Sequence, residues 1–169
     1  SVSTLRETLN RLTSEGFVSA AEQRGFFVSP VSADDLNEIA NLRILLECHA
    51  LKKSLQNGDD DWEADVAGAY HKLSTTEAIM KNGNDADLET WKEYDWQFHL
   101  SLICACNSTN LLGLHATLFG KYLRYQILVL TYRGEVARQE HKALFEAAIA
   151  RDGDAATKFL TQHIMNGLT

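Results

Sequence analysis

The sequence predicts an all-α protein: an antiparallel six-helix bundle that follows a short helix and a two-stranded hairpin. Three observations predict this fold class. Proline, which breaks helices, occurs once in 169 residues. From residue 34 onward, long segments repeat apolar residues at three- and four-residue steps, which is the spacing of one helix face. Short turns such as 57–59 and 152–154 separate these segments and favour antiparallel neighbours.

Residues 1–28 have a pattern of their own. Apolar residues at helical spacing predict a helix from Ser3 to Leu12 that ends at Glu15-Gly16, and two short strands flank a hairpin at Arg24-Gly25. A helix followed by such a wing is typical of the second half of a winged helix-turn-helix, whose helix contacts bases and phosphates. The candidate DNA-binding residues are Ser3, Thr4, Arg6, Arg11 and Arg24.

The same segment is also compatible with an ordinary surface helix and hairpin, because Glu7, Glu15 and Glu22 balance its arginines. A complete DNA reader needs two more helices upstream, so we expect the sequence to be truncated within its DNA-binding domain. The connector Ser29–Ser32 contains the proline and predicts a boundary between a partial winged helix-turn-helix at 1–31 and a helical domain at 32–169.

The helical domain divides into six segments. Apolar periodicity predicts helices over 34–56, 62–80, 88–104, 110–131 and 135–151, and a sixth from Ala155, with a turn at 81–84. Arg43 interrupts the apolar stripe of the first of these helices. A guanidinium on a buried face is usually matched to a carboxylate, and Glu47 one turn later is one candidate partner. The alternative is that Arg43 reaches into a cavity and binds the carboxylate of a small ligand.

Four residues of metal-ligand type interrupt apolar helix faces. Asp95 and His99 lie one turn apart on one predicted helix, and His141 and His163 lie on two others. Burying these groups is costly unless a charge partner compensates, and one divalent cation would satisfy all four. The alternative is a hydrogen-bonded Asp-His pair with two unrelated core histidines. His115 also lies on an apolar stripe, but nothing acidic is one turn away, so a core role is expected for it.

Composition excludes several classes of protein. Apolar residues make up 45% and charged residues 23%, as in soluble globular proteins. The net charge of −7 argues against a uniformly basic nucleic-acid coat, although it allows a local DNA-reading element. No long apolar run or signal peptide is present, so we expect a cytoplasmic protein. The three cysteines lack C-x-x-C spacing and are expected to be reduced and mostly buried.

These motifs carry a family resemblance. The pattern Asp95-x-x-x-His99, then Glu140-His141 before an alanine-rich helix, then His163, resembles the effector-binding FCD domain of GntR-type transcription regulators of the FadR subfamily. The segments Ser3–Val18 and Arg24–Val28 resemble the recognition helix and wing of the same family. Six helices after a short connector place the sequence nearest the VanR-like branch.

The resemblance implies a regulator rather than an enzyme. It implies a homodimer that binds a palindromic operator in double-stranded DNA and responds to a small carboxylic acid, such as a di- or hydroxy-carboxylate. By position, the metal ligands are Asp95, His99, His141 and His163, and the effector contacts are Arg43, Tyr122 and Arg124. Three nitrogens and one oxygen suit zinc or nickel, with manganese or iron also open.

Two other classes compete with this interpretation. A metal-dependent hydrolase or lyase would use an open metal position to activate water, but it needs a general base, and no further carboxylate is expected beside the three histidines. A structural metal site in a dimerisation module would need no cavity for an anion.

Overall fold

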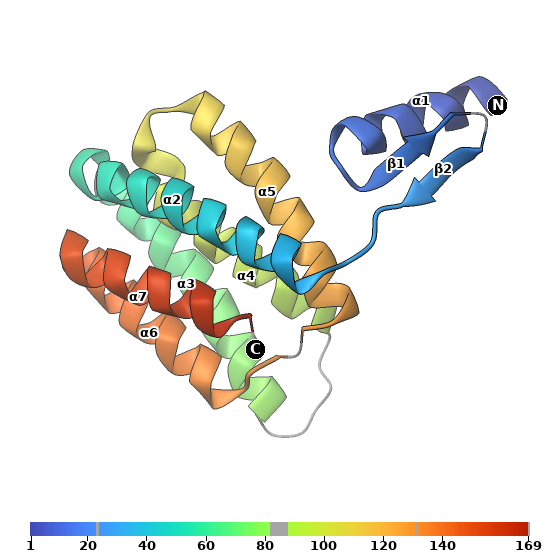
Figure 1. The fold of residues 1–169 in the computed structure, drawn as a ribbon. Helices are drawn as coiled ribbons and strands as arrows, with labels where there is room; N and C mark the ends of the chain where they lie inside the picture. Colours follow the sequence, from blue (N-terminus) through green and yellow to red (C-terminus); the bar gives the residue numbers. More distant parts are fainter. Residues whose placement is uncertain (23, 82–87, 131, 169) are drawn as a thin grey trace.

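The N-terminal part of the chain is a helix followed by a hairpin. The computed structural model describes residues 1–22, 24–81, 88–130 and 132–168. Helix α1 (Val2–Ser14) is capped by the Ser1 side chain, and strands β1 (Val18–Ala21) and β2 (Gly25–Val28) pair antiparallel with Val18 opposite Val28. This unit projects from one side of the helical bundle (Figure 1). The predicted helix and wing are therefore present in the predicted order.

The remainder of the described chain is a bundle of six α-helices and one short 3-10 helix. The elements are α2 (Ala33–Asn57), α3 (Asp60–Lys81), α4 (Leu88–Ile103), η1 (Cys104–Cys106), α5 (Thr109–Leu128), α6 (Glu135–Ile149) and α7 (Gly153–Asn166). Helix α2 packs against α5 and α7, and α3 packs against α4 and α6. Figure 1 shows α2 crossing one face of the bundle, with α6 and α7 lying side by side. The predicted all-α class is confirmed.

Side-chain caps explain where several helices begin. Ser32, Ser108 and Asp152 each accept a hydrogen bond from a backbone N–H of the first turn of α2, α5 and α7, which satisfies a group that the helix leaves unpaired. The Asp152 cap starts α7 at Gly153, two residues before the predicted start. The predicted turn at 82–84 and the predicted helix end at Thr131 lie outside the described residues.

The main core lies between all six bundle helices. Its fully buried side chains include Leu51, Leu73, Phe98, Leu144 and Leu160. A smaller cluster beside the connector contains Leu36, Ile39, Leu118, Tyr122 and Tyr125. The apolar repeats of the predicted helices at 88–104 and 110–131 include Leu88 and Val129, which predicts that both are buried. This is wrong, because Leu88 is 44% exposed at the start of α4 and Val129 is 54% exposed just after α5.

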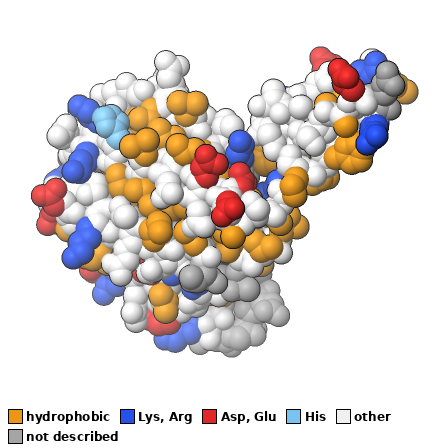
Figure 2. Space-filling view, viewed as in Figure 1, with side chains coloured by type: hydrophobic (Ala, Val, Ile, Leu, Met, Phe, Trp, Pro, Cys, Tyr) orange, Lys and Arg blue, Asp and Glu red, His pale blue; other side chains and the backbone are white. Residues whose placement is uncertain are grey.

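The surface differs from the prediction at the cysteines. Cys106 is buried, but Cys48 is half-buried and Cys104 is exposed, so the expectation that they are mostly buried is wrong; all three are free thiols. Apolar side chains also reach the surface of α2, where Leu42 and Leu45 are exposed, and Figure 2 shows hydrophobic side chains gathered over this helix. Among the described helices, none has the length and apolar character needed to cross a membrane.

Candidate metal centre and ligand cavity

The structure brings the four predicted metal-ligand residues together. Asp95 and His99 come from α4, His141 from α6 and His163 from α7, and one ligand atom from each lies within 4.8 Å of the others. The one-turn spacing on α4 places its two side chains on one inward face, as the sequence predicts. Because α6 and α7 pack side by side, their histidines complete the group from the opposite side of the core. Three separate helices therefore converge on one point.

A glutamate holds each histidine ring through its Nδ1 atom. The three pairs are His99 with Glu47 at 2.9 Å, His141 with Glu77 at 2.8 Å, and His163 with Glu140 at 2.9 Å. Such carboxylate–histidine pairs fix the ring orientation and leave Nε2 for a metal ion. The expectation that no further carboxylate lies beside the three histidines is therefore wrong, because Glu47, Glu77 and Glu140 each pair with one of them. From the sequence, Glu47 was expected only as a partner of Arg43.

The inner atoms of the cluster lack partners. Asp95 Oδ1, His99 Nε2 and His141 Nε2 are buried, and none has a hydrogen-bond partner in the described part of the chain. His141 Nε2 lies 3.2 Å from Asp95 Oδ1, but the two atoms are not aligned as a hydrogen bond. An unpaired buried polar atom costs about 1–3 kcal/mol. A divalent cation would satisfy these atoms together, so the residues present fit a metal ion.

The cluster shifts the pKa values of its own members. Burial alone would raise the pKa of the Asp95 carboxyl, but neighbouring His141, His99 and His163 hold it well below its usual range. For His141, burial lowers the pKa, yet the Asp95 and Glu77 carboxylates outweigh burial and raise it to about 9. For His163, burial and the charge of His141 together lower the pKa to about 3. The pKa values of His141 and His163 therefore shift in opposite directions.

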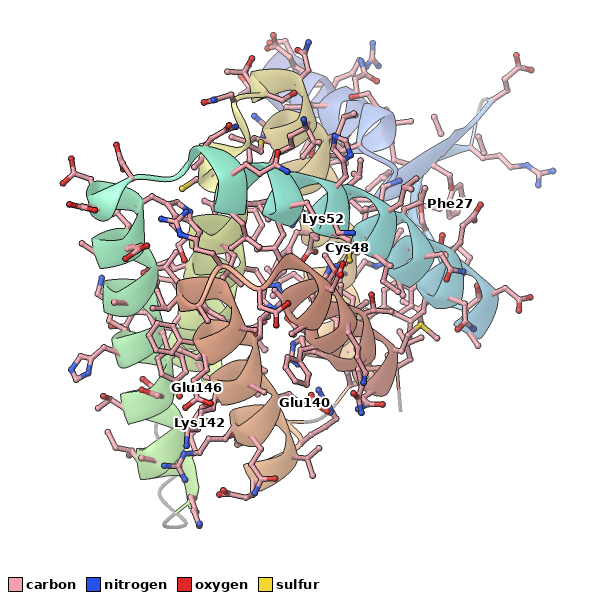
Figure 3. All side chains as sticks on the ribbon, turned by 90° about the vertical axis from the view of Figure 1, so that its left-hand side faces the viewer. Phe27, Cys48, Lys52, Glu140, Lys142 and Glu146 are labelled. Atoms are coloured by element: carbon pink, nitrogen blue, oxygen red, sulfur yellow. The ribbon has the colours of Figure 1, made fainter. Side chains whose placement is uncertain are left out.

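Glu140 is part of a wider network at the edge of the cluster. Its carboxylate accepts hydrogen bonds from both terminal nitrogens of Arg133, at 3.1 and 2.7 Å, and from Asn166 at 2.7 Å. Figure 3 shows Glu140 on the side of α6 that faces α7, whereas Lys142 and Glu146 lie on the outer side. The ring of His163 is thus fixed by a carboxylate that is itself held in place.

A cavity adjoins the metal-ligand group. About 40 Å³ of it is accessible to the centres of water molecules, and its lining includes Asp95 and His163 from the cluster together with Arg43, Tyr122 and Gln126. At roughly 10–15 Å³ for each water, the space holds about three water molecules, which is the size of a small organic acid. Gln126 Oε1 is buried without a hydrogen-bond partner in the residues described. The cavity therefore offers an unused polar group to a ligand.

Arg43 pairs with Glu47 and also lines the cavity. Its Nε donates to Glu47 at 2.7 Å, and its guanidinium carbon lies 4.2 Å from the ring centroid of Tyr122 and 4.7 Å from that of Phe119. Its Nη2 is buried and has no hydrogen-bond partner among the described residues. The guanidinium is thus anchored at one end by Glu47 while a second donor stays available beside the cavity.

Arg124 is not among the residues that line this cavity, and its role as an effector contact stays a prediction. It lines a separate hollow beside the connector, with Ser29, Pro30 and Ser32. Tyr122 and Arg124 are two residues apart on α5, so at about 100° per residue their side chains point in nearly opposite directions. Tyr122 therefore faces the central cavity, whereas Arg124 faces the hollow beside the connector.

The other predicted residues are placed as follows. Ser3, Thr4, Arg6, Arg11 and Arg24 are all exposed on α1 and at the hairpin, with Arg11 3.7 Å from Glu15. His115 is buried on α5 with its Nε2 3.1 Å from Glu47, and its ring stacks on Trp96 with centroids 5.3 Å apart. It lies outside the metal-ligand group found in the described residues, in keeping with its expected core role.

Comparisons with known proteins agree with this architecture. The family described as "FCD domain" matches residues 38–166. The "uncharacterized HTH-type transcriptional regulator BphR" of Paraburkholderia xenovorans is 35% identical over 168 residues, covering 98% of this chain and 69% of the relative. Among solved structures, E. coli McbR/YncC superposes with a TM-score of 0.80 at 22% identity and covers 95% of this chain and 79% of that one.

A second solved structure has a similar fold. The "Zn2+-bound FCD domain of TM0439, a putative transcriptional regulator" superposes with a TM-score of 0.66 at 20% identity, covering 83% of this chain and 93% of that one. At this identity the similarity shows a shared fold.

The helix and wing followed by a helical bundle with a central cavity define a class of protein, the transcription regulators of helix-turn-helix type. Within that class, the chain belongs to the GntR family of regulators that carry an FCD domain.

Proposed function

We propose that this regulator senses a small carboxylic acid at a divalent-metal centre inside its helical domain, residues 32–169, and contacts operator DNA through residues 1–31. The observation that carries the proposal is the set of buried, unpartnered atoms that face one another: Asp95 Oδ1, His99 Nε2 and His141 Nε2, with Arg43 Nη2 beside the adjoining cavity. Three inward-facing ligand atoms and a free donor are costly to bury unless a cation and an anion bind there.

The metal would be held by Asp95, His99, His141 and His163. Three nitrogens and one oxygen suit zinc or nickel, and the relative TM0439 is described with zinc bound to its FCD domain. When bound, the ion supplies an open coordination position for a carboxylate oxygen. Arg43 and Tyr122 would bind the rest of the acid, because Arg43 Nη2 is a charged donor at the cavity.

The response would reach DNA through α5 and the connector. Tyr122 lines the cavity, and Tyr125, three residues later, accepts a hydrogen bond from the Ser32 backbone at 3.2 Å and donates one to Asp35 at 2.5 Å. An effector changes operator affinity only if it binds the DNA-competent and DNA-incompetent states unequally. We propose that a homodimer binds a palindromic operator through Ser3, Thr4 and Arg6, with Arg11 and Arg24 at phosphates.

Two alternatives have less support. The named relatives are regulators, which favours a sensor over a metal-dependent hydrolase or lyase. A purely structural metal in a dimerisation module would need no neighbouring space, whereas the cluster here adjoins a cavity with a free arginine donor.

A thermal-shift screen tests the proposal. Metal-loaded protein is heated with small mono-, di- and hydroxy-carboxylic acids, with and without a chelator. We expect at least one acid to raise the melting temperature only in the metal-loaded sample, because a ligand that binds the folded state stabilises it. The matched variant is Arg43→Lys, which keeps a cation beside Glu47 but removes Nη2, so the acid-induced shift should shrink. Equal shifts with and without chelator would contradict the proposal.

A further inference from the structure

Three cationic side chains line the cavity in the part of the chain that the structure describes: Arg43, Lys92 and Arg133. Each already has a glutamate partner. The pairs are Arg43 with Glu47 at 2.7 Å, Lys92 with Glu89 at 3.0 Å, and Arg133 with Glu140 at 2.7 Å. A cation can leave its glutamate for a ligand at low cost only if water can solvate the carboxylate that it leaves.

The three glutamate partners differ in how exposed they are to water. The side chain of Glu47 is fully buried and that of Glu140 is 14% exposed, so moving Arg43 or Arg133 away would remove the permanent cation beside a largely buried carboxylate. The Glu89 side chain is 78% exposed, and water can solvate it if its partner leaves. Among the described cavity cations, Lys92 is thus the one that can leave its carboxylate partner at little cost.

Lys92 also has the position and flexibility for such a move. It is only 6% exposed, on the first turns of α4, one turn before Asp95. It lines the central cavity and also an outer groove with Glu89 and Trp96, so its side chain lies between the two spaces. Its stem has four rotatable bonds, which lets the ammonium group be redirected while the backbone stays in place.

We infer that Lys92 is a specificity-determining residue that binds the second carboxylate of a dicarboxylate effector. The inference rests on the proposed function, in which the first carboxylate is held at the metal centre and by Arg43. On binding, the Lys92 ammonium leaves Glu89 and pairs with the second acid group, whose charge would otherwise be buried without compensation. A monocarboxylate of the same length has no group for Lys92 and leaves it on Glu89.

The test compares matched acids by calorimetry on metal-loaded full chain. The probes are malonate with propionate, succinate with butyrate, and glutarate with valerate, which differ within each pair in one terminal carboxylate. Lys92→Met keeps the length of the stem and removes the charge. We expect this substitution to lower the affinity for the best-bound dicarboxylate about tenfold and to change the affinity for the matched monocarboxylate less than twofold. Lys92→Arg should retain most of the preference.

Glu89→Gln is the control, because it releases Lys92 without removing it. It should bind the dicarboxylate at least as tightly as the wild type, and metal content should be the same in all variants. The inference is overturned if Lys92→Met weakens both acids equally or neither, or if Glu89→Gln weakens the dicarboxylate as much as Lys92→Met does. A wild type that prefers monocarboxylates also overturns it. If no acid binds the wild type, the proposed function itself fails.

Discussion

At the scale of single residues, the atom that each histidine offers is decided by a glutamate from another part of the chain. Glu47, Glu77 and Glu140 engage Nδ1 of the three rings and leave Nε2 facing inward. Glu77 also accepts a hydrogen bond from Trp91 at 3.3 Å, so its carboxylate is positioned from two sides. Supporting groups of this kind are expected to matter for metal affinity nearly as much as the ligands.

His141 provides the sharpest residue-level prediction. Replacing it with alanine removes one of the four ligand atoms, so the bound metal measured by elemental analysis should fall from about one per chain to well below half. The control is His71→Ala, because His71 is exposed on α3 and should not alter the metal content. An unchanged stoichiometry in His141→Ala would remove this residue from the set of ligands.

The four ligand candidates were accessible from the sequence because each interrupts an apolar stripe, and Asp95 and His99 share one helix at a spacing that fixes their relative direction. The role of Glu77 could not be predicted, because it depends on how α3 packs against α6. Glu77 and its partner His141 are 64 residues apart in the sequence. Lys92 was missed for a similar reason: whether a cation can be released depends on how exposed its partner is, and spacing does not reveal this.

At the scale of elements, α5 connects two parts of the molecule. Tyr122 and Gln126 line the cavity, while Tyr125 contacts Ser32 and Asp35 where the connector enters α2. Burial, together with the hydrogen bond to Asp35, raises the pKa of the Tyr125 hydroxyl above its usual range. The sequence predicted this helix at 110–131, and the family resemblance implied Tyr122 as an effector contact. It could not predict the link to the connector, which joins residues more than 90 positions apart.

Tyr125→Phe tests this link. The variant loses two hydrogen bonds and keeps the ring, so we expect unfolding to become easier by about 1–2 kcal/mol. Acid binding measured by calorimetry should be nearly unchanged, while the effect of the acid on operator affinity, measured by gel shift, should shrink. The control is Tyr70→Phe, since no described residue hydrogen-bonds the Tyr70 hydroxyl, whose ring stacks on Phe145 at 4.2 Å. A full response to acid in Tyr125→Phe would contradict the coupling.

At the scale of the whole molecule, the bundle is built around a polar centre. Five of its helices contribute side chains to that centre, and apolar layers surround it. The hydrophobic pattern alone predicted the six helices and their order, because the surrounding layers follow ordinary periodicity. The pattern could not set the end of α5 or the start of α7, which depend on local caps and on where apolar side chains meet water.

Removing the metal should therefore lower the stability of the whole helical domain. At a metal concentration about a thousandfold above the dissociation constant, binding stabilises the folded state by about 4 kcal/mol. For a chain of this size, that corresponds to a fall of about 10 °C in melting temperature when a chelator is added. Differential scanning calorimetry measures the fall. His141→Ala should show little further loss with chelator, and a wild type indifferent to chelator would argue against a metal in the core.

The glutamate-backed histidines have a consequence for how this domain can change over generations. Seven interior side chains depend on one another: Glu47, Glu77, Asp95, His99, Glu140, His141 and His163. Replacing any one of them with an apolar residue leaves a neighbouring polar group buried without its partner. A stepwise evolutionary change to an apolar core would therefore pass through destabilised sequences. We therefore expect new ligand preferences to arise by substitution of cavity-lining residues outside this group, such as Lys92, while the seven side chains stay unchanged.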